Sequence, residues 1–231
     1  MNSCSNLSKL LCDHNSLTSL NLSGKTKLTV VDCSSNNMES LNLNSCSNIQ
    51  ELYCSSNNIS SLNVKNLSYL TSVQCISNRL TSLDMTGCNA LTDLYCNDNQ
   101  ITSLILPYNS DLSTISCFNN NLAGNNMDAF VTTLPDRTNK STGYLSVVAE
   151  LNEYNVFTWK NVRDAQRKNW DVLIRNADGT ISSYTGDVPT DIRTAETDID
   201  GNAPRYNLGG QRVSRDYKGV VIVNGKKVFS K

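Results

Sequence analysis

Two consecutive stretches, residues 49–69 (IQELYCSSNNISSLNVKNLSY) and residues 70–90 (LTSVQCISNRLTSLDMTGCNA), match position by position. In both, an apolar residue comes first, a cysteine sixth and an asparagine ninth. The same pattern, L-x-x-L-x-C-x-x-N-x-L-x-x-L-x-L, continues on both sides of these two stretches. It occurs six times from Leu7, once every 21 residues. Two residue types recur at the same position of every repeat. The cysteines are Cys12, Cys33, Cys54, Cys75, Cys96 and Cys117, and the asparagines are Asn15, Asn36, Asn57, Asn78, Asn99 and Asn120. A fixed period of this length predicts a solenoid in which each repeat is one coil.

The residues at the repeated positions, such as Ile49, Leu52, Cys54, Asn57 and Ile59, resemble internalin-type bacterial leucine-rich repeats. In that family a cysteine takes a core position, and the cysteines of successive coils form a ladder of thiols. The resemblance covers roughly half of the chain. It implies an α/β-type leucine-rich-repeat solenoid of six 21-residue coils, with short parallel strands and a mostly non-helical convex side.

Alternation of side chains along x-L-x-C predicts the strand of each coil, with Leu10 and Cys12 pointing into the core of the first coil. The asparagine three positions after the cysteine is expected to turn inward, as the family resemblance implies, and to bond the backbone of the turn. Such bonds satisfy buried amides that would otherwise cost about 1–3 kcal/mol each. The second half of the unit is too short for a full α-helix, so we expect extended or 3₁₀ segments there.

Nine cysteines suggest a disulfide framework, but the repeat geometry argues against one. Successive ladder cysteines project the same way into the core, whereas a disulfide needs converging side chains. Cys4, Cys46 and Cys88 recur only every second coil, roughly 10 Å apart, beyond bridging distance. All nine are therefore interpreted as buried thiols that pack as small hydrophobic groups. A metal site and an isolated disulfide are the alternatives, and we expect neither.

The outward strand positions form one continuous surface, here called the strand face. Exposed aromatic side chains with polar neighbours suit recognition of a protein or a glycan. The residues expected to bind a ligand there are Asp32, Glu51, Tyr53, Gln74, Ile76, Asp93, Tyr95 and Phe118. The alternative is that these are ordinary strand-forming residues with no ligand at all.

The pattern ends near Asn125, which gives predicted boundaries of 1–125 for the repeat array (regular from Leu7) and 126–186 for an α/β C-terminal cap. In the cap we expect a helix capped by Asn125 or Asn126 and ending near Thr133. A strand over 143–151, a helix over 155–170 and a strand pair over 171–186 follow, with Trp159 and Trp170 packing inside the cap. An acidic, aperiodic stretch over 187–204 is typical of a linker.

Residues 205–231 carry alternating strand patterns and the hairpin signal Asn224-Gly225. We predict a small β-hairpin module there. Its pieces YNLGGQRV and KGVVIVNGKKV are similar to the C-terminal sorting modules of secreted, surface-attached proteins in gliding-type bacteria. A plain β-hairpin appendage is the alternative interpretation.

Catalytic residues are not expected. The single histidine, His14, stands where other repeats have serine, aspartate or asparagine, and no glycine-rich phosphate loop or metal-ligand cluster accompanies it. The net charge of −1 gives no electrostatic reason to bind nucleic acid. We therefore expect a non-enzyme without cofactor or metal.

The chain opens in the middle of the repeat pattern and lacks a secretory signal at its start, so the signal is expected upstream of Met1. No apolar run is long enough to cross a membrane. The sequence favours an extracellular or cell-surface binding module, monomeric, with a protein or glycan partner that is host-derived if the internalin resemblance extends to function. The alternative function is a structural spacer within a larger surface protein.

Overall fold

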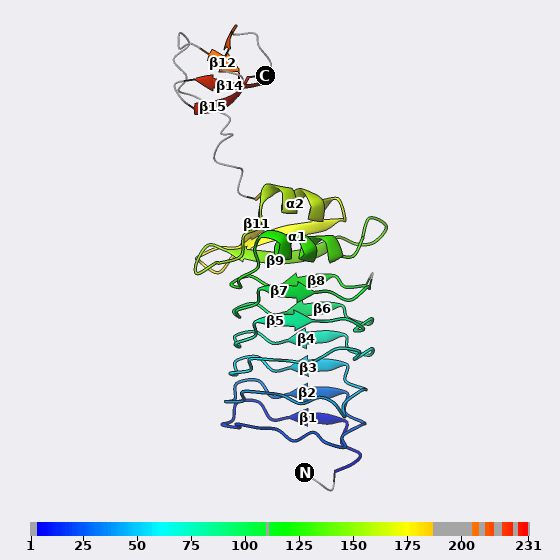
Figure 1. The fold of residues 1–231 in the computed structure, drawn as a ribbon. Helices are drawn as coiled ribbons and strands as arrows, with labels where there is room; N and C mark the ends of the chain where they lie inside the picture. Colours follow the sequence, from blue (N-terminus) through cyan, green and yellow to red (C-terminus); the bar gives the residue numbers. More distant parts are fainter. Residues whose placement is uncertain are drawn as a thin grey trace. The chain divides into compact units, whose positions relative to one another are not determined.

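The structure, a computed structural model, describes residues 4–109, 111–186, 205–207, 211–214, 219–223 and 226–230. The chain divides into two compact units, Met1–Tyr184 and Thr185–Lys231. The first unit holds the repeats together with the segment predicted to cap them, and the second holds the C-terminal strands (Figure 1). The predicted linker, 187–204, lies outside the described residues.

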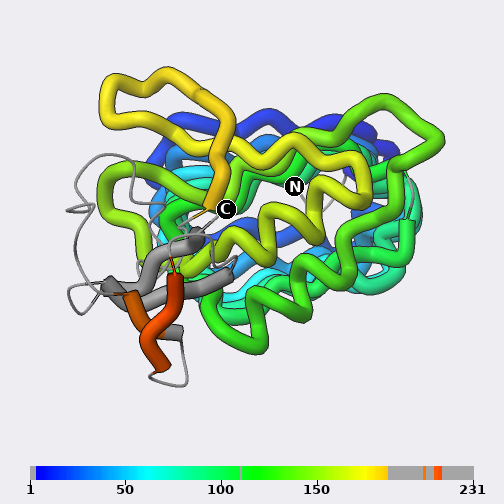
Figure 2. Tube along the Cα trace, turned by 90° about the horizontal axis from the view of Figure 1, so that it is seen from above, coloured from blue at the N-terminus to red at the C-terminus, as the bar shows by residue number. Residues whose placement is uncertain are grey.

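Each repeat contributes one three-residue strand to a parallel stack. These strands are β1 (Lys9–Leu11), β2 (Val30–Asp32), β3 (Glu51–Tyr53), β4 (Ser72–Gln74), β6 (Asp93–Tyr95) and β8 (Thr114–Ser116). Every strand pairs with the next one without a shift in register, so equivalent residues of successive repeats are direct neighbours. Figure 2 shows the consequence, because the successive coils follow nearly the same path when seen from above.

The other half of each coil is extended, as predicted. Two of these segments are strands, β5 (Ser82–Asp84) and β7 (Ser103–Ile105), which pair in parallel as a second, two-stranded sheet. An isolated parallel bridge joins Leu41 to Leu62 at the equivalent position of earlier coils. Among the described residues before Gly124, no helix interrupts the coils. The parallel stack and these extended segments therefore enclose one core.

The core is continuous along the stack because each coil contributes side chains at the same positions. In the third coil, for example, Ile49, Leu52 and Cys54 are buried, as are Ile59 and Leu62. The first coil has no coil beneath it in the structure, and its Leu7, Leu10 and Leu20 are only partly covered. Burial is therefore set by stacking on neighbours, as expected for a solenoid.

A sharp turn follows every strand of the stack. The residue two positions after each ladder cysteine has a positive φ of 51° to 57°, which is the left-handed region. The six residues with this conformation are His14, Ser35, Ser56, Ser77, Asp98 and Asn119. The short polar side chains tolerate this backbone better than β-branched ones do. This turn aims the next residue, the ladder asparagine, back toward the coils.

After the sixth repeat, the first unit ends in two helices and three strands. They are α1 (Gly124–Thr133), β9 (Gly143–Ala149), α2 (Trp159–Gln166), β10 (Trp170–Arg175) and β11 (Ile181–Ser183). Strands β9 and β10 continue the parallel sheet beyond β8, and β11 adds an antiparallel edge. The stack therefore passes into this region without a break in the sheet (Figure 1).

The predicted helix start in this region was wrong in detail. Ala123 is the N-cap of α1, and no side chain caps it. The Asn126 Nδ2 instead donates to the Thr102 carbonyl of the coil below, at 2.8 Å. Helix α2 is shorter than the predicted 155–170 because Thr158 and Asn161 form a reciprocal capping box at its start.

The two tryptophans of this region lie in different environments. Trp170 is buried and its indole Nε1 donates to the Pro135 carbonyl at 2.9 Å. Trp159 is 41% exposed, and the Arg163 guanidinium lies 5.1 Å from its ring centroid. Only Trp170 is therefore a core residue of the kind predicted.

The second unit contains a four-stranded antiparallel sheet. Its strands are β12 (Arg205–Asn207), β13 (Arg212–Val213), β14 (Gly219–Val223) and β15 (Lys226–Ser230), in the order β13-β12-β14-β15. Strands β14 and β15 pair antiparallel within the segment where a hairpin is predicted, and the expected turn, Asn224-Gly225, lies outside the described residues. The unit is thus a small sheet, more than a single hairpin.

Candidate functional site: the strand face and the ladders behind it

The strand face rests on an asparagine ladder that fixes the end of each strand. Asn57 shows the interior pattern, since its Oδ1 accepts from the Met38 amide at 3.0 Å. Its Nδ2 donates to the carbonyls of Cys33 (3.0 Å), Cys54 (3.2 Å) and Ser55 (3.2 Å). One side chain thus satisfies backbone groups of two adjacent coils. Asn36, Asn78, Asn99 and Asn120 make the same set of bonds.

The two ends of this ladder differ from its middle. The Asn15 side chain is exposed and donates within its own coil, to the carbonyls of Cys12 and Asp13. At the other end Asn155, which the repeat pattern does not mark, acts as a seventh member. Its Oδ1 accepts from the Leu122 amide and its Nδ2 donates to the Cys117 carbonyl. Asn155 lies 35 residues after Asn120, so no periodic signal could have found it.

The thiol ladder runs through the core directly behind the strand face. All nine cysteines are free, and Cys33, Cys46, Cys54, Cys75, Cys88, Cys96 and Cys117 are buried. The prediction that all nine are buried was wrong at the start of the chain, where Cys4 is exposed and Cys12 half-buried. The physical reason is that no coil of the structure covers the first one.

Burial controls the acidity of these thiols. Loss of solvation raises the pKa of the Cys33 thiol to about 12 and that of Cys88 to about 11. The same cause raises the pKa of Cys54, Cys75 and Cys96 well above the usual value. These groups stay protonated at neutral pH, and protonated thiols are poor nucleophiles and poor metal ligands. Burial and raised pKa values together favour a packing role for the ladder thiols.

Thiol labelling of the native protein tests this arrangement. With a disulfide-exchange reagent at pH 8 and no reductant, we expect rapid reaction at Cys4, slower reaction at Cys12 and none at the seven buried cysteines. In denaturant, all nine should react. A denatured count below nine would reveal a disulfide, and rapid native labelling of Cys54 or Cys75 would contradict the closed core.

In-register pairing sorts the strand face into columns that run along the stack. One column contains Val30, Glu51, Ser72, Asp93 and Thr114, and the next contains Asp32, Tyr53, Gln74, Tyr95 and Ser116. Neighbouring members of a column are one strand spacing apart, about 4.8 Å. The predicted residues Asp32, Glu51, Gln74 and Asp93 are half-buried on this surface, as is Ile76, two positions beyond β4.

Each of two tyrosines on the face has a carboxylate beside it. The Tyr53 hydroxyl donates to Glu51 Oε2 at 3.1 Å. Partial burial, together with Glu51, raises the Tyr53 pKa, and partial burial with the charge of Asp93 raises that of Tyr95. Both phenols are therefore neutral at physiological pH. The two half-buried rings combine apolar area with a polar edge, which is the usual composition of a recognition surface.

Phe118 is buried, so the prediction that it is an exposed residue of the strand face was wrong. It is only 8% exposed, and the Arg175 guanidinium lies 5.7 Å from its ring centroid. Arg175 comes from β10, which follows the repeats, whereas the equivalent residues of the first four coils, Asp13, Ser34, Ser55 and Ile76, are half-buried. The repeat pattern predicted an exposed Phe118 because periodicity carries no information on which later residues pack against the last coil.

Tyr144 is a face residue that the sequence pattern missed. It lies in β9 and pairs directly with Thr114, which continues the column of Glu51 and Asp93 beyond the repeats. Its side chain is 53% exposed. The alternating strand over 143–151 was recognisable in the sequence, but its parallel docking on β8 was not.

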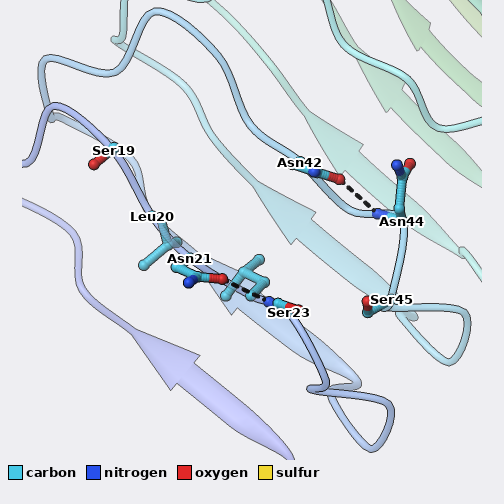
Figure 3. Close-up of a pocket in the computed structure, with 8 residues that line it drawn as sticks. Ser19, Leu20, Asn21, Ser23, Asn42, Asn44 and Ser45 are labelled. Carbon is cyan, nitrogen blue, oxygen red and sulfur yellow. Dashed lines mark hydrogen bonds between the residues drawn. The ribbon is translucent and has the colours of Figure 1, made fainter. Parts of the chain in front are cut away.

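Two hollows elsewhere on the first unit are lined in part by polar side chains that already have hydrogen-bond partners within the protein. A groove of about 300 Å³ lies between the first two coils, and Figure 3 shows its Asn21 and Asn42 side chains engaged in turn bonds to Ser23 and Asn44. A cavity of about 690 Å³ is lined in part by Tyr108 and Lys168. The Lys168 Nζ donates to three carbonyls that end helix α1, so it is already satisfied. Neither hollow competes with the strand face as a ligand site.

Comparison with solved structures agrees with this geometry. The leucine-rich-repeat domain of APL1B matches with a TM-score of 0.57 and 21% identity, over 74% of this chain and 56% of that one. An internalin, inlF from Listeria monocytogenes, matches with a TM-score of 0.55 and 19% identity, over 72% of this chain and 47% of that one. The chain has a leucine-rich-repeat fold. The array is internalin-like in its stacking and carries its cysteines as an internal ladder.

The functional domain of InlJ from Listeria monocytogenes, which includes a cysteine ladder, is also similar, with a TM-score of 0.47 and 23% identity over 73% of this chain and 40% of that one. The leucine-rich-repeat chain thus spans about half the length of the structures it matches. No protein-family model and no curated protein matches its sequence.

The described part of the leucine-rich-repeat chain shows no group of three or more histidine, cysteine, aspartate or glutamate side chains placed to hold a metal ion. None of its described helices is long and apolar enough to cross a lipid bilayer.

Proposed function

We propose that the chain is a non-catalytic binding module, located outside the cell or on its surface, that recognises a protein or glycan through the strand face. The observation that carries the proposal is the pair of half-buried tyrosines, Tyr53 and Tyr95, in one column of an otherwise serine- and asparagine-rich solenoid. Rigid aromatic side chains lose little entropy on binding and dominate many interfaces. The regular stack holds them at fixed positions, so the surface is preorganised.

The double variant Tyr53→Ala/Tyr95→Ala tests the proposal. The wild-type chain is first screened on an array of extracellular proteins and glycans, and saturable binders are then measured with both proteins. Loss of two aromatic anchors should weaken binding by about 2–4 kcal/mol, or at least about thirtyfold. The variant should keep its thermal stability to within a few degrees because both side chains are only half-buried.

Tyr69→Ala/Tyr108→Ala is the matched control. These tyrosines are 58% and 103% exposed and lie in the connectors between coils, away from the strand face. The control should bind like wild type. If it lost the partner while Tyr53→Ala/Tyr95→Ala kept it, the site would lie along the connectors, and the proposal would fail.

A structural spacer is the second candidate function, favoured by the small apolar content of the coil surfaces. Within the described coils, the exposed large hydrophobic residues are Leu11, Tyr69, Ile105 and Tyr108. A spacer would yield no saturable binder on the array. The proposed module is expected to act as a monomer, which light scattering of the purified chain would check.

A further inference from the structure

The strand face repeats one small unit twice. Residues Glu51-Leu52-Tyr53-Cys54 and Asp93-Leu94-Tyr95-Cys96 have the same order of acid, leucine, tyrosine and cysteine, 42 residues apart. Strand β4 lies between them and places Ser72 and Gln74 at the corresponding positions. Two acid–tyrosine pairs are therefore separated by two strand spacings, or about 9.6 Å along the stack.

The charge of the strand face is acidic from β2 onward. Among the outward residues of β2, β3, β4, β6 and β8, Asp32, Glu51 and Asp93 are acidic and none is basic, whereas β1 at the first coil carries the exposed Lys9 in the column of Val30. Glu51 accepts from the Tyr53 hydroxyl, and Asp93 Oδ2 accepts from the Thr92 Oγ1 at 2.7 Å. A carboxylate can accept about four hydrogen bonds, so each has capacity left for a donor from a partner. The face is thus complementary to a cationic ligand.

A neighbouring ring makes each carboxylate a more selective partner for a cation. A lysine or arginine that pairs with Glu51 or Asp93 also lies within reach of Tyr53 or Tyr95. A cation over a tyrosine ring gains about 0.5–1 kcal/mol at exposed sites, in addition to the ion pair. Ser72 and Gln74 between the two pairs are small or flexible and leave the path between them open.

The separation of the pairs selects the form of the ligand. A polyproline II segment has three residues per turn and a rise of about 3.1 Å, so side chains at i and i+3 project from one side about 9.3 Å apart. That distance is close to the 9.6 Å between the acid–tyrosine pairs. A β-strand brings i and i+2 to the same side at about 6.7 Å, which does not match.

We propose that the strand face binds an extended basic protein segment in the polyproline II conformation, with lysine or arginine at positions i and i+3. The segment runs along the stack, with one cation at Glu51 and Tyr53 and the other at Asp93 and Tyr95. This inference rests on the proposed function, since it uses the same surface, and it adds the chemical class of the partner. A neutral glycan is the competing ligand and becomes an outcome of the test.

Two fluorescent peptides of equal composition test the spacing. Pro-Pro-Lys-Pro-Pro-Lys-Pro-Pro carries lysines at i and i+3, and Pro-Lys-Pro-Pro-Pro-Lys-Pro-Pro carries them at i and i+4. Fluorescence anisotropy at 50 mM NaCl should show at least about fivefold tighter binding of the first peptide, with further weakening as salt rises. Equal binding of the two peptides would mean attraction by charge alone, and no binding of either would also overturn the inference.

Glu51→Gln/Asp93→Asn tests the carboxylates. This variant keeps the hydrogen-bond acceptors for Tyr53 and Thr92 but removes two negative charges. Its affinity for the i, i+3 peptide should be at least about tenfold lower than that of the wild type. Glu39→Gln/Asp178→Asn is the matched control, because it changes the net charge equally at two exposed positions off the face. The control should bind as wild type does apart from the small long-range effect of charge.

The two proposals fail in distinguishable ways. If the array yields a partner, or a neutral glycan, that is lost in Tyr53→Ala/Tyr95→Ala but retained by Glu51→Gln/Asp93→Asn, the strand face is the binding site and the basic-segment inference is wrong. If the peptide binds with the expected spacing and charge dependence but tyrosine removal has no effect on any ligand, the carboxylates act alone and the role of the rings is wrong.

Discussion

Asn57→Ala should destabilise the protein by about 3–5 kcal/mol, the largest effect we expect from any single ladder substitution. The alanine leaves the amide of Met38, in a fully buried residue, without its acceptor. It also removes a donor from three carbonyls in two coils. An unpaired buried backbone group costs about 1–3 kcal/mol, and water has no access to replace the lost bonds. Urea unfolding followed by circular dichroism measures the change.

Asn15→Ala is the control for that experiment, since it has the same repeat position and the same chemistry. Asn15 is exposed and its side chain donates to the carbonyls of Cys12 and Asp13 in its own coil, while the backbone amide that donates to the Ser35 carbonyl is kept in the alanine variant. Its replacement should cost less than about 1 kcal/mol. Equal losses for the two variants would show that the cost comes from local turn propensity. In that case bonding between coils would not be the source of ladder stability.

Arg137→Ala should have the second-largest effect, a loss of about 3–4 kcal/mol. Arg137 is 3% exposed, and its Nη1 donates to the Leu112 carbonyl at 2.9 Å while its Nε donates to the Ser141 carbonyl at 3.0 Å. Its guanidinium also lies 5.8 Å from the centroid of the Trp170 ring. The substitution removes bonds between the last repeat and the segment that follows it. Thermal unfolding and tryptophan fluorescence would report the change.

Arg175→Ala is the comparison for Arg137. Arg175 also lies over an aromatic ring, that of Phe118, but its side chain is exposed. Its loss should cost about 1 kcal/mol or less. If Arg137→Ala were equally mild, the junction between the last repeat and the segment of β9 and β10 would depend on apolar packing, and the buried guanidinium would contribute little.

The repeat residues predicted most of the array because one physical constraint acts at every position. Cys54 and Asn57 recur every 21 residues, and a side chain that must fit the same place in each coil is readable without a structure. Where the neighbour changes, the prediction failed. Cys4 and Cys12 lie at the first coil, which has a neighbour on one side only, and are less buried, while Phe118 is buried with Arg175 over its ring.

The candidate binding surface was predictable only in its repeated part. The column positions of Glu51, Tyr53, Asp93 and Tyr95 follow from periodicity, since equal offsets become direct neighbours in a parallel stack. Tyr144 and Asn155 were beyond such reasoning. Both come from the non-repeated segment, where the docking of β9 on β8 is decided by long-range packing and not by local pattern.

The asparagine ladder also restricts how this gene product can change in length during evolution. From Asn36 onward each ladder asparagine donates to the preceding coil, and each turn has a left-handed residue one position earlier, as at Ser56 before Asn57. An insertion or deletion of a few residues within a coil would misalign both, whereas the gain or loss of an entire 21-residue unit leaves every remaining bond intact. The gain or loss of complete repeats would lengthen or shorten the stack of coils in steps of about 4.8 Å. Removing only the unit of β4 would bring the two acid–tyrosine pairs next to each other, so copy number alone can alter what the surface recognises.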